Sequence, residues 1–127
     1  MESARRLRVL VVDDNEDAAT SLAWLVAAWG YEVRTAFDGV TALIQAEDFR
    51  PNVVLCDLAM PGVDGCKVAE SLHHHAEFSG SFLVAVTAYG DDVHRGRAAR
   101  AGFHARLVKP VDEQGLHRLL RAHAASA

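Results

Sequence analysis

Five short apolar segments, alternating with stretches of helical periodicity, constrain the fold of this chain more than any other feature. Four of them are apolar at nearly consecutive positions, which is typical of strands buried on both faces of a sheet, and one alternates. The predicted strands are residues 7–12, 31–37, 53–56, 82–86 and 105–108. Repeated strand–helix units of this kind build a parallel sheet with helices on both faces. We therefore predict a doubly wound, three-layer α/β/α fold.

The stretches between these strands carry the apolar faces and end signals of amphipathic helices. The first has one apolar face, formed by Leu22, Leu25, Val26 and Trp29. Gly30 then follows at the position where helices commonly end. Aspartates precede or open the later helices, at Asp38, Asp64, Asp91 and Asp112. The last helix has one face made of Leu116, Leu119, Leu120 and His123.

Length and composition predict one globular domain. The chain has 127 residues, 50% hydrophobic and 24% charged, which excludes disorder and fits one domain over 1–127 with a core from about 7 to 124. No apolar run reaches the roughly 20 residues of a membrane-spanning helix, and no signal peptide is visible. Two cysteines fit a reducing compartment, and the net charge of −4 argues against nucleic acid as a direct partner. We expect a cytoplasmic protein.

Polar side chains follow four of the predicted strands, at the point where each strand ends. Asp13 and Asp14 follow the first strand, and Asp57 follows the third. Thr87 and Lys109 follow the fourth and fifth strands. Because the carboxyl ends of parallel strands meet at one edge of the sheet, where ligands bind in open α/β folds, these five residues are expected to share one pocket.

The residue types in this pocket favour phosphoryl chemistry. Three crowded carboxylates stay ionised only beside a cation, and oxygen ligands favour Mg²⁺, with Mn²⁺ as an alternative, over Zn²⁺. A carboxylate can act as a nucleophile toward phosphorus, while a hydroxyl and an ammonium hold the phosphoryl oxygens. The chain has no glycine-rich, phosphate-cradling loop, so we expect a phosphoryl donor other than ATP.

Four blocks of sequence resemble the receiver domain of two-component response regulators: residues 9–15, 57–65, 87–88 and 109–110. They occur in the same order as in that family, and the likeness runs from about residue 8 to about residue 122. The resemblance implies a flavodoxin-like (βα)5 fold with a five-stranded sheet in the order 2-1-3-4-5. It also implies a signalling phosphoacceptor in a phosphorelay rather than an enzyme.

The resemblance also implies roles for the polar residues. Asp57 would accept a phosphoryl group from the phosphohistidine of a sensor histidine kinase or histidine phosphotransfer protein. Mg²⁺ would be held by Asp13, Asp14, Asp57 and the backbone carbonyl of Ala59. Thr87 and Lys109 would bind phosphoryl oxygens.

In receivers the lysine precedes a cis proline, so the bond between Lys109 and Pro110 is expected to be cis. Phosphorylation would change the face formed by the fourth helix, fifth strand and fifth helix, which downstream protein partners read.

Three positions bear on switching and on the lifetime of the phosphoryl group. Receivers commonly carry Tyr or Phe three residues before the lysine, whereas this chain has Arg106. Arg106 is either a surface residue whose stem covers apolar surface, or a sign that switching proceeds without an aromatic rotamer. In receivers Ala59 and Tyr89 would flank the water that hydrolyses the aspartyl phosphate. An alanine cannot orient that water and a tyrosine ring obstructs it, so we predict a long-lived phosphoryl group.

Other functions fit the residues less well. A magnesium-dependent phosphatase resembling the haloacid dehalogenase group needs a second aspartate two residues after the nucleophile, where this chain has Ala59. A phosphorylation-independent interaction module does not need the complete acidic set. A receiver cut from a hybrid histidine kinase or a larger regulator stays open, although no output domain is visible in these residues.

The remaining motifs are interpreted as structural. His73, His74 and His75 point about 100° apart on a helix, so they are not expected to share a metal ion. Cys56 and Cys66 are interpreted as packing residues. Residues 93–127 hold seven bases and two acids, whereas residues 1–92 hold six bases and 15 acids. We therefore expect acidic protein partners for the C-terminal part.

Overall fold

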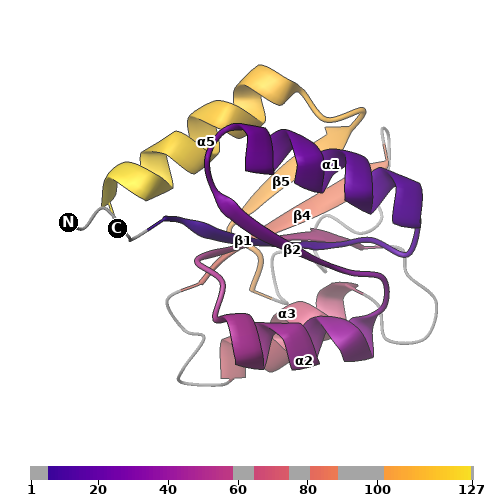
Figure 1. Ribbon diagram of the computed structural model, residues 1–127. Coiled ribbons are helices and arrows are strands. Elements are labelled where there is room, and N and C mark those ends of the chain that lie inside the picture. The colour runs from indigo at the N-terminus through magenta and orange to yellow at the C-terminus, as the bar shows by residue number, and fades with distance from the viewer. Residues whose placement is uncertain (1–5, 59–64, 75–80, 89–101, 127) are drawn as a thin grey trace.

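The five predicted strands form one parallel sheet in the order β2-β1-β3-β4-β5 (Figure 1), as the resemblance implied. The structure is a computed structural model that describes residues 6–58, 65–74, 81–88 and 102–126. Its strands are β1 (Arg8–Val12), β2 (Glu32–Ala36), β3 (Val53–Asp57), β4 (Phe82–Ala88) and β5 (Ala105–Lys109). Because β1 and β3 are neighbouring parallel strands, their carboxyl ends lie side by side.

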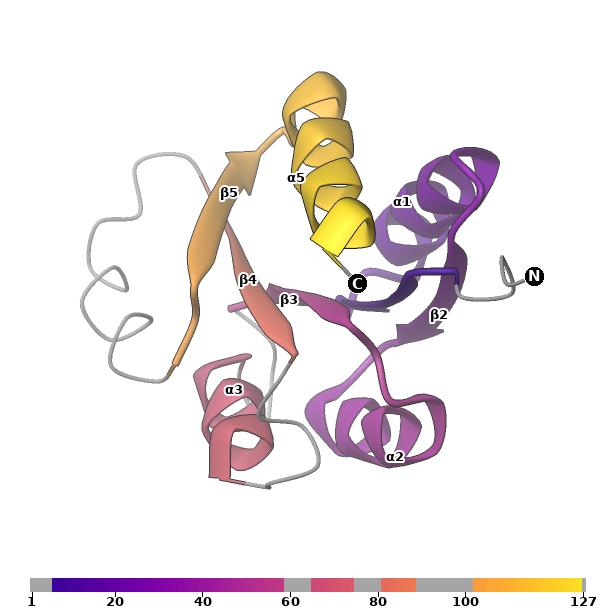
Figure 2. The ribbon, with the colours of Figure 1, turned by 90° about the vertical axis from the view of Figure 1, so that its left-hand side faces the viewer.

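Helices cover both faces of the sheet. The described helices are α1 (Glu16–Ala28), α2 (Gly39–Phe49), α3 (Gly65–His74) and α5 (Glu113–Ser126). Figures 1 and 2 show α1 and α5 on one face and α2 and α3 on the other. The predicted α/β/α layering is confirmed, while the helix expected at Asp91 and the cap at Asp64 lie outside the described residues. None of the described helices is long and apolar enough to span a bilayer.

Alternating side chains of the central strands fill a separate core on each face. Leu10 and Val54 pack toward α2 and α3, whereas Val11 and Leu55 pack toward α1 and α5. All four are at most 1% exposed, and burying such a side chain contributes roughly 1.5–3 kcal/mol each. Packing against helices on both faces of the sheet thus fixes the positions of β1 and β3, and with them the positions of their carboxyl ends.

Local signals set where the helices begin and end. The Asp38 carboxylate accepts a hydrogen bond of 2.7 Å from the backbone N–H of Thr41. This bond lowers the pKa of Asp38, because it stabilises the ionised form. Asn15 caps α1 in the same way, accepting from the Ala18 N–H at 3.1 Å, although the sequence pattern had not singled it out. Gly30 has φ +97° after α1, as predicted for a helix end.

Substituting Leu10 by alanine is expected to lower the free energy of unfolding by about 2–5 kcal/mol, because it leaves a cavity under a central strand. Trp24→Ala, at a side chain that is 73% exposed, is the matched control and is expected to change it by about 0.5 kcal/mol or less. Urea denaturation followed by circular dichroism measures both. Equal effects of the two substitutions would contradict the packing described here.

Candidate functional site

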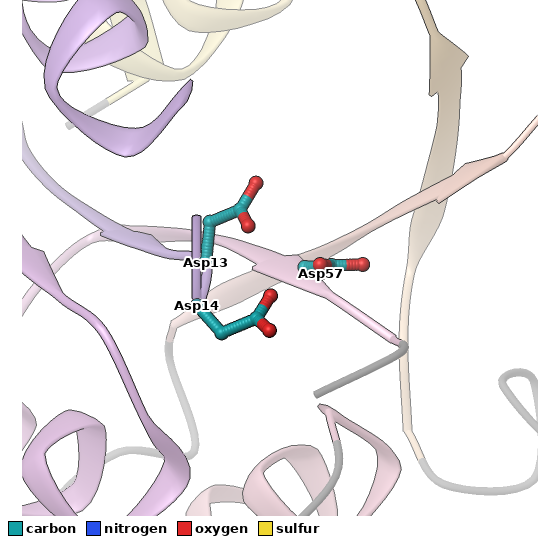
Figure 3. Close-up of side chains that lie close together, drawn as sticks. All are labelled: Asp13, Asp14 and Asp57. Atoms are coloured by element: carbon teal, nitrogen blue, oxygen red, sulfur yellow. The ribbon is translucent and has the colours of Figure 1, made fainter. Parts of the chain in front are cut away.

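The carboxyl ends of β1 and β3 bring together three aspartates that the sequence predicted to converge. Asp13 and Asp14 follow β1, and Asp57 is the last residue of β3. Figure 3 shows their carboxylates turned toward a common space, and one oxygen of each lies within 4.8 Å of the others. Asp13 and Asp57 are buried, whereas Asp14 is exposed.

Lys109, the last residue of β5, contacts two of these carboxylates. Its Nζ donates to Asp13 Oδ2 at 3.2 Å and lies 3.8 Å from Asp57 Oδ2. The second oxygen of Asp13 accepts a hydrogen bond of 3.0 Å from the backbone N–H of Asn15. One ammonium offsets only part of the repulsion among three carboxylates, so the pocket favours a further cation.

The donor set is that of a hard divalent cation. Three carboxylates supply oxygen ligands only, and the exposure of Asp14 leaves the pocket open to water on one side. Oxygen ligands combined with retained water are typical of Mg²⁺ and Mn²⁺ sites. The acidic triad is therefore able to bind such a metal ion.

Thr87 brings a buried hydroxyl to the same edge of the sheet. It lies on β4 next to Val108 of β5, one residue beyond the pairing of Val86 with Asp57. The residue is 3% exposed, and its Oγ1 has no hydrogen-bond partner within the described residues. An unpaired buried hydroxyl costs about 1–3 kcal/mol, so this group is poised to bond to something that enters the pocket.

Three of the five strands extend further at their carboxyl ends than the sequence pattern predicted. The predicted third, fourth and fifth strands stop just before Asp57, Thr87 and Lys109. In the structure these residues lie within β3, β4 and β5, because backbone pairing continues to the contacts of Asp57 with Val86 and of Ala88 with Lys109. Asp57, Thr87 and Lys109 are therefore held by regular strand backbone, whereas Asp13 and Asp14 directly follow β1.

The structure describes the other predicted site residues only in part. The peptide bond between Lys109 and Pro110 is cis, as expected. Arg106 lies in β5 and is half-buried. Ala59 and Tyr89 lie outside the described residues, so their roles stay predictions.

An apolar groove adjoins the acidic triad and was not anticipated from the sequence. It has a volume of about 310 Å³ and lies between α1 and the start of α5. Leu22, Leu25 and Val111 line it, and Asp57 and Lys109 are also part of its lining. The sequence pattern placed Leu22 and Leu25 only on the apolar face of the first predicted helix. Leu22 and Leu25 are half-buried because of the spacing between α1 and α5, and the periodicity of one helix cannot predict that spacing.

The fold and the acidic pocket define an α/β domain of the receiver type. Residues 9–121 match the family described as the response regulator receiver domain, and the chain belongs to that family. It is 31% identical over 115 residues to Protein PilH of Pseudomonas aeruginosa, covering 91% of this chain and 95% of that protein. It is 36% identical over 115 residues to Response regulator PleD of Caulobacter vibrioides, covering 91% of this chain but only 25% of that protein.

Solved structures of receivers superpose closely on this one. A putative response regulator from Chloroflexus aurantiacus gives a TM-score of 0.88 at 30% identity, covering 95% of this chain and 99% of that one. The receiver domain of sensor histidine kinase PA1611 from Pseudomonas aeruginosa gives 0.86 at 26% identity, with coverages of 95% and 99%. The latter structure contains a magnesium ion coordinated in the active site cleft.

Asp13→Asn is expected to weaken Mg²⁺ binding about tenfold or more, because one of three converging charges is removed. Asp48→Asn is the matched control, since the Asp48 carboxylate is exposed and pairs with Arg34 on α2's side of the molecule. Isothermal titration with MgCl₂ measures both affinities. An unchanged affinity in Asp13→Asn would show that the triad is not the metal site.

Proposed function

We propose that Asp57 accepts a phosphoryl group from a phosphohistidine on a sensor histidine kinase or a histidine phosphotransfer protein. The contact of Lys109 with both Asp13 and Asp57 carries this proposal, because it places a cation where phosphoryl charge has to be held. The family assignment supports a kinase partner. The chain then acts as a signalling phosphoacceptor whose only chemistry is its own phosphorylation and dephosphorylation.

Asp57 is the best placed of the three carboxylates to act as nucleophile. Both oxygens of Asp13 already accept hydrogen bonds, from Lys109 and from the Asn15 N–H. Asp14 is exposed, and solvation of its carboxylate by water makes it a weaker nucleophile toward phosphorus. Asp57 is buried on a central strand beside Lys109, where a covalent adduct is held on rigid backbone.

In the proposed step, a carboxylate oxygen of Asp57 forms a bond to phosphorus as the bond between phosphorus and the donor imidazole nitrogen breaks. The imidazole leaves with that electron pair and takes a proton from solvent, and an aspartyl phosphate remains. Lys109 Nζ donates to a phosphoryl oxygen, and the Thr87 hydroxyl donates to another. When bound by Asp13, Asp14 and Asp57, Mg²⁺ supplies positive charge that neutralises the phosphoryl oxygens.

The groove beside Asp57 supports a protein as the phosphoryl donor. Leu22 and Leu25 give a partner an apolar surface next to the reacting carboxylate. On the output side, α5 exposes Arg118 and Arg121, which supports the proposal that downstream partners are acidic.

Incubation with acetyl phosphate and Mg²⁺ is expected to add one phosphoryl group to the wild-type chain and none to Asp57→Asn. Intact-mass spectrometry reads the product directly. Asp48→Asn is again the control and is expected to be modified like the wild type. Modification of Asp57→Asn to the wild-type level would place the acceptor elsewhere.

Lys109→Met is expected to slow phosphorylation by acetyl phosphate by about 10²-fold, because one preorganised donor to the developing phosphoryl charge is lost. Arg118→Met removes a cation from the exposed side of α5 and serves as the control. Time-resolved intact-mass measurements give the rates. A rate within twofold of wild type for Lys109→Met would remove Lys109 from the proposed chemistry.

A further inference from the structure

The apolar groove beside Asp57 runs along α1, which lies next to α5 on one face of the sheet (Figure 2). Ala18, Ser21, Leu22 and Leu25 line the groove, and their spacing along the helix puts them on one side of it. From Ala18 to Leu25 the helix rises about 10 Å. Since α1 begins directly after the carboxyl edge of β1, the groove extends from that edge back over the sheet. The small side chains of Ala18 and Ser21 leave this space open.

The groove is apolar along its length and charged at one end. Its floor is made of core residues of the central strands that pack beneath α1 and α5: Val11, Leu55 and Val86. Leu22 on α1 and Val111 before α5 are half-buried, so apolar surface stays partly accessible in the groove. The charged end is lined by Asp13, Asp57 and Lys109. A ligand that fills the groove therefore has an apolar body and a charged head.

The charges at this end favour a phosphoryl head over other anionic heads. A carboxylate head is disfavoured, because it would lie beside the carboxylates of Asp13 and Asp57. A phosphoryl head is favoured, because Lys109 Nζ lies 3.8 Å from Asp57 and the acidic triad is able to hold a divalent cation. The volume of about 310 Å³ is at the lower end of the roughly 300–1,000 Å³ of small-molecule pockets, which fits a short chain. An acyl phosphate combines such a head with such a chain.

We propose that the groove binds the hydrocarbon chain of acyl phosphates, so that a short-chain donor such as hexanoyl phosphate phosphorylates Asp57 better than acetyl phosphate does. A carboxylate oxygen of Asp57 forms a bond to phosphorus as the bond between phosphorus and the acyl oxygen breaks. The fatty acid carboxylate leaves with that electron pair, and no proton is transferred. The inference rests on the proposed function of Asp57 and adds a small-molecule donor to the protein donor.

The size of the preference follows from the apolar surface that the chain buries. Each methylene buried in the groove strengthens binding by up to about fourfold. Hexanoyl phosphate has four methylenes more than acetyl phosphate, so partial burial is expected to raise the second-order rate constant about 10- to 100-fold. The chain is bound equally before and during the transfer. The gain therefore lowers the half-saturating donor concentration and leaves the limiting rate unchanged.

The first test compares the two donors on the full chain with Mg²⁺, by time-resolved intact-mass spectrometry. Wild type is expected to prefer hexanoyl phosphate about tenfold or more. Ser21→Phe fills the groove and is expected to reduce the ratio of the two rate constants to about threefold or less. Ala28→Phe places the same ring at an exposed position of α1 outside the groove, and it is expected to keep the wild-type ratio. Comparing ratios within each variant removes any general effect on Asp57.

The second test measures binding without phosphoryl transfer. Hexylphosphonate has no transferable phosphoryl group and is added with Mg²⁺ to ¹⁵N-labelled protein. The amide resonances of Leu22, Leu25 and Val111 are expected to shift, because these residues line the groove. Methylphosphonate at the same concentration is the control and is expected to leave those resonances unchanged.

Equal rate constants for the two donors in wild type, an undiminished preference in Ser21→Phe or the same shifts with both phosphonates would each overturn the proposal. If Ser21→Phe does not fold, Ala18→Leu fills the groove from the preceding turn of α1 and replaces it. If neither donor phosphorylates the wild type, the proposed function of Asp57 fails. The hexylphosphonate titration then still decides whether the groove binds a hydrocarbon chain.

Discussion

Repulsion among three carboxylates at one edge of the sheet is the interaction on which the rest of the site depends. Asp13, Asp14 and Asp57 place oxygens within 4.8 Å of one another, two of them on buried residues. Lys109 offsets part of that repulsion through contacts of 3.2 and 3.8 Å. The remaining negative charge explains why the pocket favours a metal cation. Lys109 supplies a positive charge that can bind the oxygens of an incoming phosphoryl group.

The scaffold makes this crowding possible by fixing the strand ends before any ligand binds. Strands β1 and β3 are apolar on both faces, so packing from two helical layers holds them in place. That burial offsets the cost of holding charges close together. The same packing leaves the groove between α1 and α5 next to Asp57, so the acceptor and a surface for a partner protein share one end of the molecule.

Most of the fold was predictable because its signals are local. The strands, the cap at Asp38 and the helix end at Gly30 follow from spacing and residue type, and the structure confirms them. Features that depend on how separate elements sit together were not predictable. The sequence placed Trp29 on the apolar face of the first helix, but it did not predict that its ring stacks on His117 of α5 with centroids 4.2 Å apart. The groove and the additional strand residues around Thr87 were not predictable either. The groove depends on the spacing between helices, and the strand ends depend on backbone pairing with the neighbouring strand.

By itself, the sequence determined which chemistry the site can hold, because it placed carboxylates, a hydroxyl and an ammonium at the ends of successive apolar strands. The tertiary structure alone decided which of these groups touch. Lys109 and Asp13 are separated by 96 positions, and their contact at 3.2 Å depends on sheet order and register. Local patterns fix side-chain periodicity within an element, whereas packing between elements fixes the distances that chemistry requires.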